Sequence, residues 1–276
     1  EILQQIKSLQ KATSKLPQWT TRKGIIFPKP EVIEQASSHA TANYKATITH
    51  KGNLFLDLTA GSGSDFFTLS TNFDKGYGID IDIENISLLK HNAPLLTSTP
   101  LTILHGTAEE IIPDLSNNFD VIYLDPQRRT ERGKKGLFRL EETSPNIIEL
   151  LPILKQKAKM ILIKTSPYMD ITEGLRQLPG TSEVHIVEHD KQCKEVLFVI
   201  NQKTSNQESV QIISANLDKN TIYQAPYPSH NVMDVPLSTP LTYIYEPGPA
   251  LMKSELHTNY AIENNLNELA PLTHLY

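Results

Sequence analysis

The chain has 276 residues, of which 39% are hydrophobic and 21% charged, and its formal net charge is −5. These values are typical of a soluble globular protein with one large domain and a smaller piece. They argue against a protein that binds nucleic acid over its whole surface, but they do not exclude a local basic patch. No apolar run reaches transmembrane length, no signal peptide is visible, and the single cysteine, Cys193, excludes an internal disulfide and a cysteine-rich metal site.

These exclusions predict a cytoplasmic protein with no membrane partner and no bound metal, and they leave the oligomeric state open. The chain begins at Glu1 without a methionine, so we expect it to be an excised piece of a longer protein.

Residues 1–48 are predicted to form an N-terminal helical segment. Apolar residues recur at helical spacing from Ile2 to Leu16, and Pro17 ends that helix. A second helical stretch begins at Glu31 and carries polar groups just before the first strand. Two of them, Tyr44 and Lys45, belong either to an ordinary polar helix surface or to a lid at the mouth of a ligand site.

A strand-type run, Asn53–Leu58, opens into a glycine-containing turn and then into an apolar helical segment. Strand, tight turn and helix form the first βα unit of a nucleotide-binding α/β sheet, and the alternative is an ordinary βα turn. Gly61 and Gly63 permit positive φ and a close approach of backbone to ligand. A dinucleotide fingerprint needs a third glycine where Phe66 stands, and no phosphate-loop motif is present, so both of those sites are excluded.

The second strand, Gly76–Ile81, places Asp80 at its carboxyl end, about twenty residues after the first glycine. A carboxylate at this position accepts hydrogen bonds from both hydroxyls of a ribose. Asp80 therefore indicates a ribose without selecting the cofactor that carries it.

Three further strands are predicted at Leu101–His105, Asp120–Leu124 and Met160–Ile163. Thr107 follows the first of these and begins a T-x-x-E capping box. The alternative role for this segment is contact with an adenine.

Two later strands, Ser182–Glu188 and Glu195–Asn201, are separated by about six residues, too few for a parallel crossover. They must form a hairpin, and a parallel sheet closed by one antiparallel strand is typical of class I methyltransferases. We therefore predict a seven-stranded, Rossmann-like α/β sheet over residues 49–204. Residues 208–276, with strand-like runs at 210–215, 221–227 and 241–245 and a helical stretch at 251–269, are expected to form a small α+β, ferredoxin-like and incomplete domain.

The fourth strand ends in Asp125 and Pro126, outside the carboxyl edge where ligands bind in open α/β sheets. The alternative is a simple Asp-Pro turn. The dipeptide resembles the start of the D/N/S-P-P-aromatic motif of amino methyltransferases, although Gln127 and Arg128 replace its last two residues. The basic run that follows is interpreted either as a solvated loop or as a loop that binds nucleic acid phosphates.

Four stretches together resemble a bacterial branch of class I S-adenosylmethionine (SAM)-dependent RNA methyltransferases with ferredoxin-like and THUMP-like segments, related to trimethylguanosine synthase-like enzymes: QASSHATANYKA, DLTAGSGSD, YGIDID and YLDPQRR. The resemblance implies catalysis at Asp125 and Pro126 and SAM as cofactor. The residues expected to bind SAM are Tyr44, Lys45, Asp57, Thr59, Ala60, Gly61, Gly63, Asp65, Asp80, Ile81, Thr107 and Ala108. Those expected to bind substrate are Gln127, Arg128, Arg129, Arg132, Lys134 and Lys135.

The sequence thus predicts an enzyme that methylates RNA, either tRNA or rRNA, at an exocyclic base amine. A small-molecule methyltransferase is the first alternative. The second is a non-catalytic SAM- or RNA-binding protein, because the motif after Asp125 is altered. The target nucleotide is left open.

Overall fold

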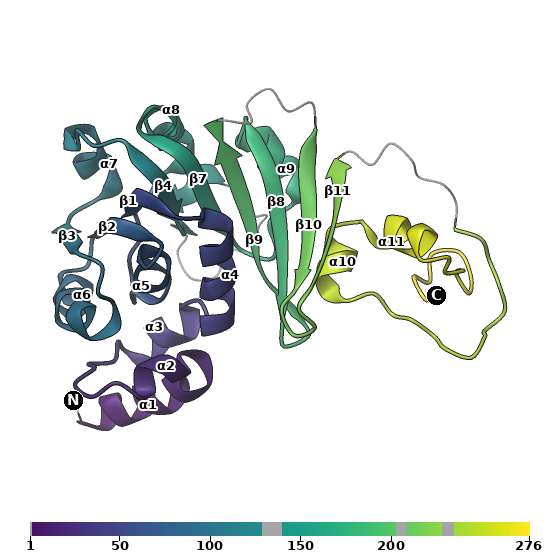
Figure 1. Cartoon of the computed structure of the whole chain (residues 1–276), viewed down its shortest axis with the longest axis horizontal. Coiled ribbons are helices and arrows are strands. Elements are labelled where there is room, and N and C mark those ends of the chain that lie inside the picture. The colour runs from purple at the N-terminus through teal and green to yellow at the C-terminus, as the bar shows by residue number, and fades with distance from the viewer. Residues whose placement is uncertain (1, 129–139, 203–208, 228–234) are drawn as a thin grey trace. The chain divides into compact units, whose positions relative to one another are not determined.

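Figure 1 shows a computed structural model that describes residues 2–128, 140–202, 209–227 and 235–276. Contacts divide the chain into two compact units, Glu1–Lys164 and Thr165–Tyr276. Each unit is considered separately below.

The first unit is built on parallel strands in the order β7-β4-β1-β2-β3. This order confirms the expected α/β architecture and brings the carboxyl ends of the strands to one edge. The strands are β1 (Gly52–Asp57), β2 (Phe73–Asp80), β3 (Leu101–His105), β4 (Phe119–Leu124) and β7 (Ala158–Thr165).

Helices surround this sheet, and polar side chains fix where several of them begin. Asp82 caps α6, and Thr107 with Glu110 forms the expected capping box of α7. The helical stretch expected from Glu31 breaks at Ala36, whose backbone is extended, and Ser38 caps a new helix. The helices are α1 (Ile2–Lys15), α2 (Pro17–Thr20), α3 (Pro30–Gln35), α4 (His39–Thr49), α5 (Ser64–Ser70), α6 (Ile83–Leu96), α7 (Ala108–Ile111) and α8 (Ile147–Lys157).

Short elements complete the first unit: two 3-10 turns, η1 (Ile112–Asp114) and η2 (Leu140–Glu142), and a two-stranded ribbon of β5 (Gln127–Arg128) and β6 (Thr143–Ser144). None of the helices in the described ranges has the length and apolar character needed to cross a bilayer.

In the second unit β8 (Thr181–His189) and β9 (Gln192–Asn201) pair antiparallel, which confirms the expected hairpin. Asp190 and Lys191 form its turn with φ of 52° and 56°, as a two-residue hairpin loop requires. The remaining elements are β10 (Val210–Asn216), β11 (Thr221–Tyr227), α9 (Ile171–Gln177), α10 (Pro249–Lys253) and α11 (His257–Glu263).

The expectation of seven strands is wrong: within the described residues the main sheet has nine, five in the first unit and four in the second. The additional strands are β10 and β11, because β10 pairs in parallel with β8 and antiparallel with β11. Residues 241–245, expected to be a strand, have no strand conformation. The helical stretch expected over 251–269 is instead two short helices, α10 and α11, the second of which ends at Glu263. Local sequence patterning marks strands but does not select their partners.

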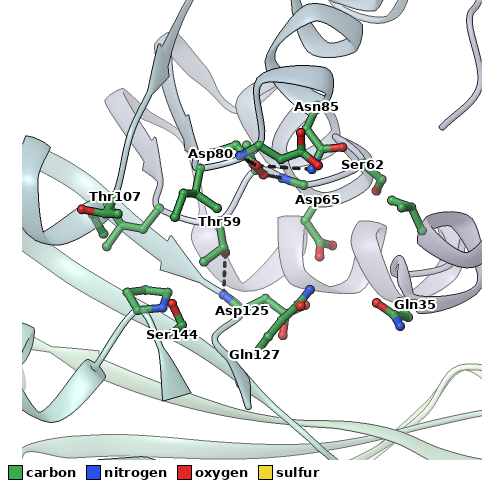
Figure 2. Close-up of a pocket in the computed structure, with 18 of the residues that line it drawn as sticks. Gln35, Thr59, Ser62, Asp65, Asp80, Asn85, Thr107, Asp125, Gln127 and Ser144 are labelled. Atoms are coloured by element: carbon green, nitrogen blue, oxygen red, sulfur yellow. Dashed lines mark hydrogen bonds between the residues drawn. The ribbon is translucent and has the colours of Figure 1, made fainter. Parts of the chain in front are cut away.

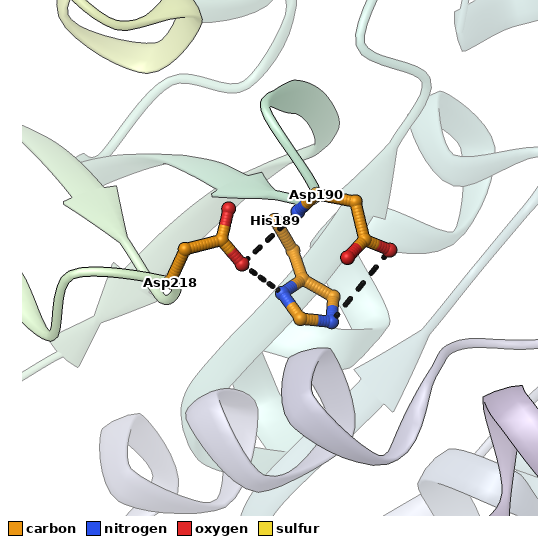
Figure 3. Close-up of side chains that lie close together, drawn as sticks. All are labelled: His189, Asp190 and Asp218. Carbon is orange, nitrogen blue, oxygen red and sulfur yellow. Dashed lines mark hydrogen bonds and ion pairs between the residues drawn. The ribbon is translucent and has the colours of Figure 1, made fainter.

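Asp218 holds the β8–β9 turn in place, as Figure 3 shows. Its carboxylate accepts hydrogen bonds from the backbone N–H groups of Asp190 and Lys191, each at 3.1 Å, and lies 2.7 Å from His189 Nδ1. The backbone donors lower the pKa of Asp218. His189, Asp190 and Asp218 are residue types that can bind a metal ion, and the hydrogen bonds account for their proximity as a clamp on the turn.

Gly78 in β2 lets helix α5 approach the sheet, whereas Gly76 leaves room for a side chain of the neighbouring strand β3. A Cβ atom at Gly78 would lie 2.7 Å from Phe66 Cζ, and one at Gly76 would lie 2.6 Å from Leu101 Cδ2. Phe66 is fully buried in this space, directly after the glycine turn. The close packing fixes the start of α5 relative to the end of β2.

We predict that Gly78→Ala lowers the free energy of unfolding by about 1–3 kcal/mol, because the added methyl group overpacks the Phe66 ring. Urea denaturation measures this loss. The matched control is Asp74→Ala on the exposed side of the same strand, which should change stability by less than about 0.5 kcal/mol. Equal stability of the two variants would contradict the packing argument.

Candidate functional site

A cavity of about 450 Å³ lies in the first unit where β1, β2, β3 and β4 end (Figure 2). Its volume falls within the usual range for small-molecule sites. The lining residues come from the α3–α4 connection, the glycine turn and the ends of the strands. They are Val32, Gln35, Ala36, Ser37, Leu58, Thr59, Ala60, Gly61, Ser62, Asp65, Asp80, Ile81, Asp82, Asn85, Gly106, Thr107, Ala108, Glu109, Asp125, Gln127, Ser144 and Pro145.

The glycine turn has the left-handed backbone that its sequence predicts. Gly61 has φ of 51° and lines the cavity, whereas Gly63, with φ of 91°, lies behind the lining. A Cβ at Gly63 would lie 2.4 Å from Phe67 Cε2, so only glycine fits there. The Gly63 N–H also donates to Ala60 O at 2.8 Å, which closes the turn.

Asp80 connects the second strand to this turn. Its Oδ2 accepts the Gly61 N–H at 2.7 Å, and its Oδ1 accepts the Asp82 N–H at 2.8 Å and Asn85 Nδ2 at 3.2 Å. A carboxylate has about four acceptor positions, so these bonds leave capacity for a ligand hydroxyl. Asp80 is thus both a support for the turn and part of the cavity wall.

Asp57 lies beneath the turn and does not line the cavity. Its Oδ1 accepts the Thr59 N–H at 2.8 Å, and its Oδ2 has no hydrogen-bond partner in the described part of the chain. Burial raises the pKa of Asp57 well above its usual range, and the charges of Asp65 and Asp125 raise it further. Asp57 is therefore harder to ionise than an exposed aspartate.

Asp65 lies at the centre of a buried polar network beside the cavity. Lys45 Nζ lies 3.2 Å from Asp65 Oδ1 in an ion pair, and Asp65 Oδ2 accepts from Ser37 Oγ and Tyr123 OH, each at 2.7 Å. Burial alone would raise the pKa of Asp65, but the charges of Lys45 and Lys164 and these hydrogen bonds lower it overall. Asp65 therefore stays ionised.

Tyr44 and Lys45 are buried in α4 behind the cavity wall. The wall itself is formed by the break between α3 and α4, where Gln35 and Ser37 reach the cavity (Figure 2 shows Gln35). Lys45 acts on this wall indirectly, because its Nζ donates to Ser37 Oγ at 3.1 Å. The sequence pattern indicates this segment but not which of its residues face the ligand.

Asp125 enters the cavity from the end of β4. Its backbone N–H donates to Thr59 Oγ1 at 2.7 Å, as the dashed line in Figure 2 shows, and its Oδ2 forms an ion pair with Lys164 Nζ. The Asp125 side chain is 33% exposed, against 13% for Lys164. Gln127 also lines the cavity, whereas Pro126 is buried beside it.

The basic run after Gln127 begins at Arg128. Arg128 contributes backbone to β5, and Arg129, Arg132, Lys134 and Lys135 lie outside the described residues.

At the other end of the cavity, Ile81, Thr107 and Ala108 form part of the wall. The Thr107 hydroxyl accepts the Glu110 N–H at 3.2 Å, so it also caps α7. Several lining residues were not anticipated. Ser62 and Asn85 are next to recognised motifs, whereas Ser144 is brought in by pairing of β6 with β5 and has no local signal in the sequence.

A protein-family model described as "Conserved hypothetical protein 95" matches residues 28–172. The chain belongs to this family. No curated protein matches the sequence.

Among solved structures, the chain resembles that of a "putative methyltransferase" from Porphyromonas gingivalis W83, with 28% identity and a TM-score of 0.89, covering 100% of this chain and 69% of that one. With the mixed α/β sheet, this likeness supports the class I methyltransferase fold. Two more distant likenesses carry no argument about function. One is a "putative rRNA-methylase" from Clostridium thermocellum, with 17% identity and a TM-score of 0.42, covering 58% of this chain and 94% of that one. The other is a precorrin-6y C5,15-methyltransferase from Geobacter metallireducens GS-15, with 18% identity and a TM-score of 0.43, covering 67% of this chain and 94% of that one.

We predict that Lys45→Met lowers the free energy of unfolding by about 3–5 kcal/mol at neutral pH, because it leaves the Asp65 carboxylate buried without its cation. The folded-state pKa of Asp65 is lowered, so the contribution of the pair is present above the unfolded pKa and is lost as pH falls through the folded pKa. Urea denaturation of wild type and variant below about pH 4 should therefore show a smaller difference. Lys45→Met/Asp65→Asn should recover part of the loss at neutral pH, and a pH-independent difference would contradict the ion-pair account.

Proposed function

We propose that this chain is a SAM-dependent methyltransferase that modifies RNA at an exocyclic base amine. The observation that carries the proposal is convergence: the glycine turn, Asp80 and Asp125 all reach one cavity at the carboxyl edge of the parallel sheet. The likeness to the Porphyromonas gingivalis structure supports an enzyme of this type with SAM as its cofactor.

The chemistry of the cavity suits SAM. Gly61 and its neighbours present backbone rather than side chains, Asp80 offers acceptor capacity for ribose hydroxyls, and Thr107 with Ala108 borders the far end. SAM supplies an electrophilic methyl group. We propose that the residues expected from the sequence to bind the cofactor do so. Those that line the cavity are in a position to touch it, and Tyr44, Lys45, Asp57 and Gly63 support the wall from behind.

Methylation of an amine needs the nitrogen lone pair directed in line at the methyl carbon. We assign this positioning to Asp125 and the Pro126 carbonyl, which accept hydrogen bonds from the two N–H groups of the amine. Lys164, which is less exposed than Asp125, holds the Asp125 carboxylate in an ion pair. The nitrogen gains a carbon bond as the methyl carbon leaves sulfur, and the amine then gives up one proton to solvent.

The RNA assignment rests on the resemblance of the motifs and on the basic run that contains Arg128, Arg129, Arg132, Lys134 and Lys135, which we propose contacts phosphates. The relation to enzymes with a THUMP-like segment and to trimethylguanosine synthase-like enzymes belongs to the same proposal. The replacement of Pro and an aromatic residue by Gln127 and Arg128 favours the competing assignment, a small-molecule methyltransferase.

The direct test is transfer of a labelled methyl group from SAM to fractionated bacterial RNA, with mapping of the modified nucleotide. Label in one RNA species at an exocyclic nitrogen is the expected result. Transfer only to small molecules would replace this assignment with the competing one.

Asp80→Ala should weaken SAM binding by about 1.5–3 kcal/mol, because hydrogen bonds to a charged acceptor are lost. Calorimetric titration of SAM into the folded variant measures the change. Asp114→Ala, a matched removal of a carboxylate outside the cavity lining, should leave the affinity unchanged. Near-wild-type affinity in Asp80→Ala would remove Asp80 from the proposed site.

Asp125→Ala should abolish most turnover while leaving SAM affinity largely intact, because Asp125 orients the amine and not the cofactor. Asp125→Asn, which keeps an acceptor oxygen, should retain more activity than the alanine variant. The single-turnover rates of the wild type and both variants are measured with saturating SAM and RNA. Full turnover in Asp125→Ala would refute the amine-positioning role.

A further inference from the structure

The N-terminal region, residues 2–29, has a charge opposite to that of the rest of the protein. It holds six cationic residues and no acidic residue, whereas the net charge of the whole chain is −5, so the remaining residues together carry −11. A local basic region on an acidic protein attracts polyanions without making the whole surface adhesive. The six residues, which we call the N-terminal basic surface, are Lys7, Lys11, Lys15, Arg22, Lys23 and Lys29.

Three of these side chains have charge available for a partner. Lys7, Arg22 and Lys23 are exposed and form no ion pair within the part of the chain that the structure describes. Lys11 and Lys29 form exposed pairs with Glu34 and Glu84. Exposed pairs of this kind contribute only about 0–1 kcal/mol, so a phosphate can replace the carboxylate at little cost.

The backbone that carries these cations is fixed to the rest of the first unit. Gln5 exchanges hydrogen bonds with the backbone of Phe27 at 2.8 and 3.0 Å, and buried Ser8 donates to Pro28 O at 2.7 Å. The Asn92 side chain makes a similar pair of bonds with Ile26, at 3.1 and 2.8 Å. A surface held in this way loses little conformational entropy when a ligand binds.

This surface adjoins the cavity. Lys11 and Lys15 both contact Glu34, through its side chain and its backbone carbonyl, and the next residue, Gln35, lines the cavity. On another side, Lys29 pairs with Glu84 at 2.6 Å, next to the lining residue Asn85. Lys11, Lys15 and Lys29 therefore contact α3 and α6, the two helices that carry the lining residues Gln35 and Asn85.

We propose that the N-terminal basic surface binds the phosphate backbone of the RNA whose base enters the cavity. This inference rests on the proposed function and adds a docking surface to it, separate from the basic run after Gln127. The surface supplies affinity through phosphate contacts, whereas the cavity selects the base.

The test compares two variants that remove the same charge. Lys7→Gln/Lys23→Gln alters the surface, and Lys51→Gln/Lys219→Gln removes two exposed lysines elsewhere, Lys51 at the amino end of β1 and Lys219 in the second unit. Binding of a fluorescein-labelled RNA stem-loop is followed by anisotropy over a range of salt concentrations. Circular dichroism confirms that each variant is folded.

Each lost phosphate contact should flatten the log–log salt dependence by about 0.7–0.9. We expect Lys7→Gln/Lys23→Gln to reduce the slope by about 1.5 and the affinity about 10-fold or more near 0.1 M salt. The control variant should stay close to the wild type. Adding Arg22→Gln should flatten the slope once more.

Equal effects of the two double variants, or no effect of either, would overturn the inference. If methyl transfer to RNA persists in that case, the proposed function survives without this docking surface. A wild-type protein that binds no stem-loop would overturn both.

A membrane partner is tested in parallel. Helix α1 also exposes Ile2 at 79%, Leu3 at 75% and Ile6 at 47%, and a basic helix with an apolar side can lie on anionic lipid. Co-sedimentation uses vesicles of phosphatidylserine and phosphatidylcholine. Binding to vesicles but not to the stem-loop, abolished in Lys7→Gln/Lys23→Gln, would overturn the RNA assignment.

Discussion

The buried pair of Lys45 and Asp65 is the interaction on which the site depends. Each charge would cost several kcal/mol to bury alone, so the two must stay together with hydrogen-bond donors around them. Because Ser37 and Tyr123 both donate to Asp65, one carboxylate joins the α3–α4 connection, helix α5 and strand β4. The cavity wall and the glycine turn are thereby held in one fixed relation.

Three aspartates lie in this region, and the electrostatic environment of each is different. Burial raises the pKa of Asp57, Lys45 compensates the charge of Asp65, and Lys164 pairs with Asp125. Only Asp125 has substantial exposure to the cavity. This arrangement leaves one accessible carboxylate at the end of β4, in a cavity that is also lined by the acidic residues Asp80, Asp82 and Glu109. Such a carboxylate can orient a neutral aromatic amine, which needs no deprotonation before it attacks.

Outside the cavity, the N-terminal region carries a positive charge. The N-terminal basic surface surrounds part of the wall with cations on a framework fixed by Gln5, Ser8 and Asn92. Under the proposed function, the exposed cations would attract the RNA, and hydrogen bonds in the cavity would orient the reacting base. The net acidity of the chain limits attraction of a polyanion to its local basic regions.

The sequence by itself determined the parallel strands, the glycine turn, the caps at Asp82 and Thr107, and the β8–β9 hairpin. Each of these follows from local rules: apolar runs end in polar residues, positive φ favours glycine, and a short connection forbids a crossover. Tertiary structure alone decided the partner of β10, the break at Ala36 and the burial of Tyr44 and Lys45 behind the wall. It also decided the ion pair of Asp125 with Lys164 and the pairing of β5 with β6. These features depend on long-range pairing and on the need to compensate buried charge, and neither leaves a periodic signal along the chain.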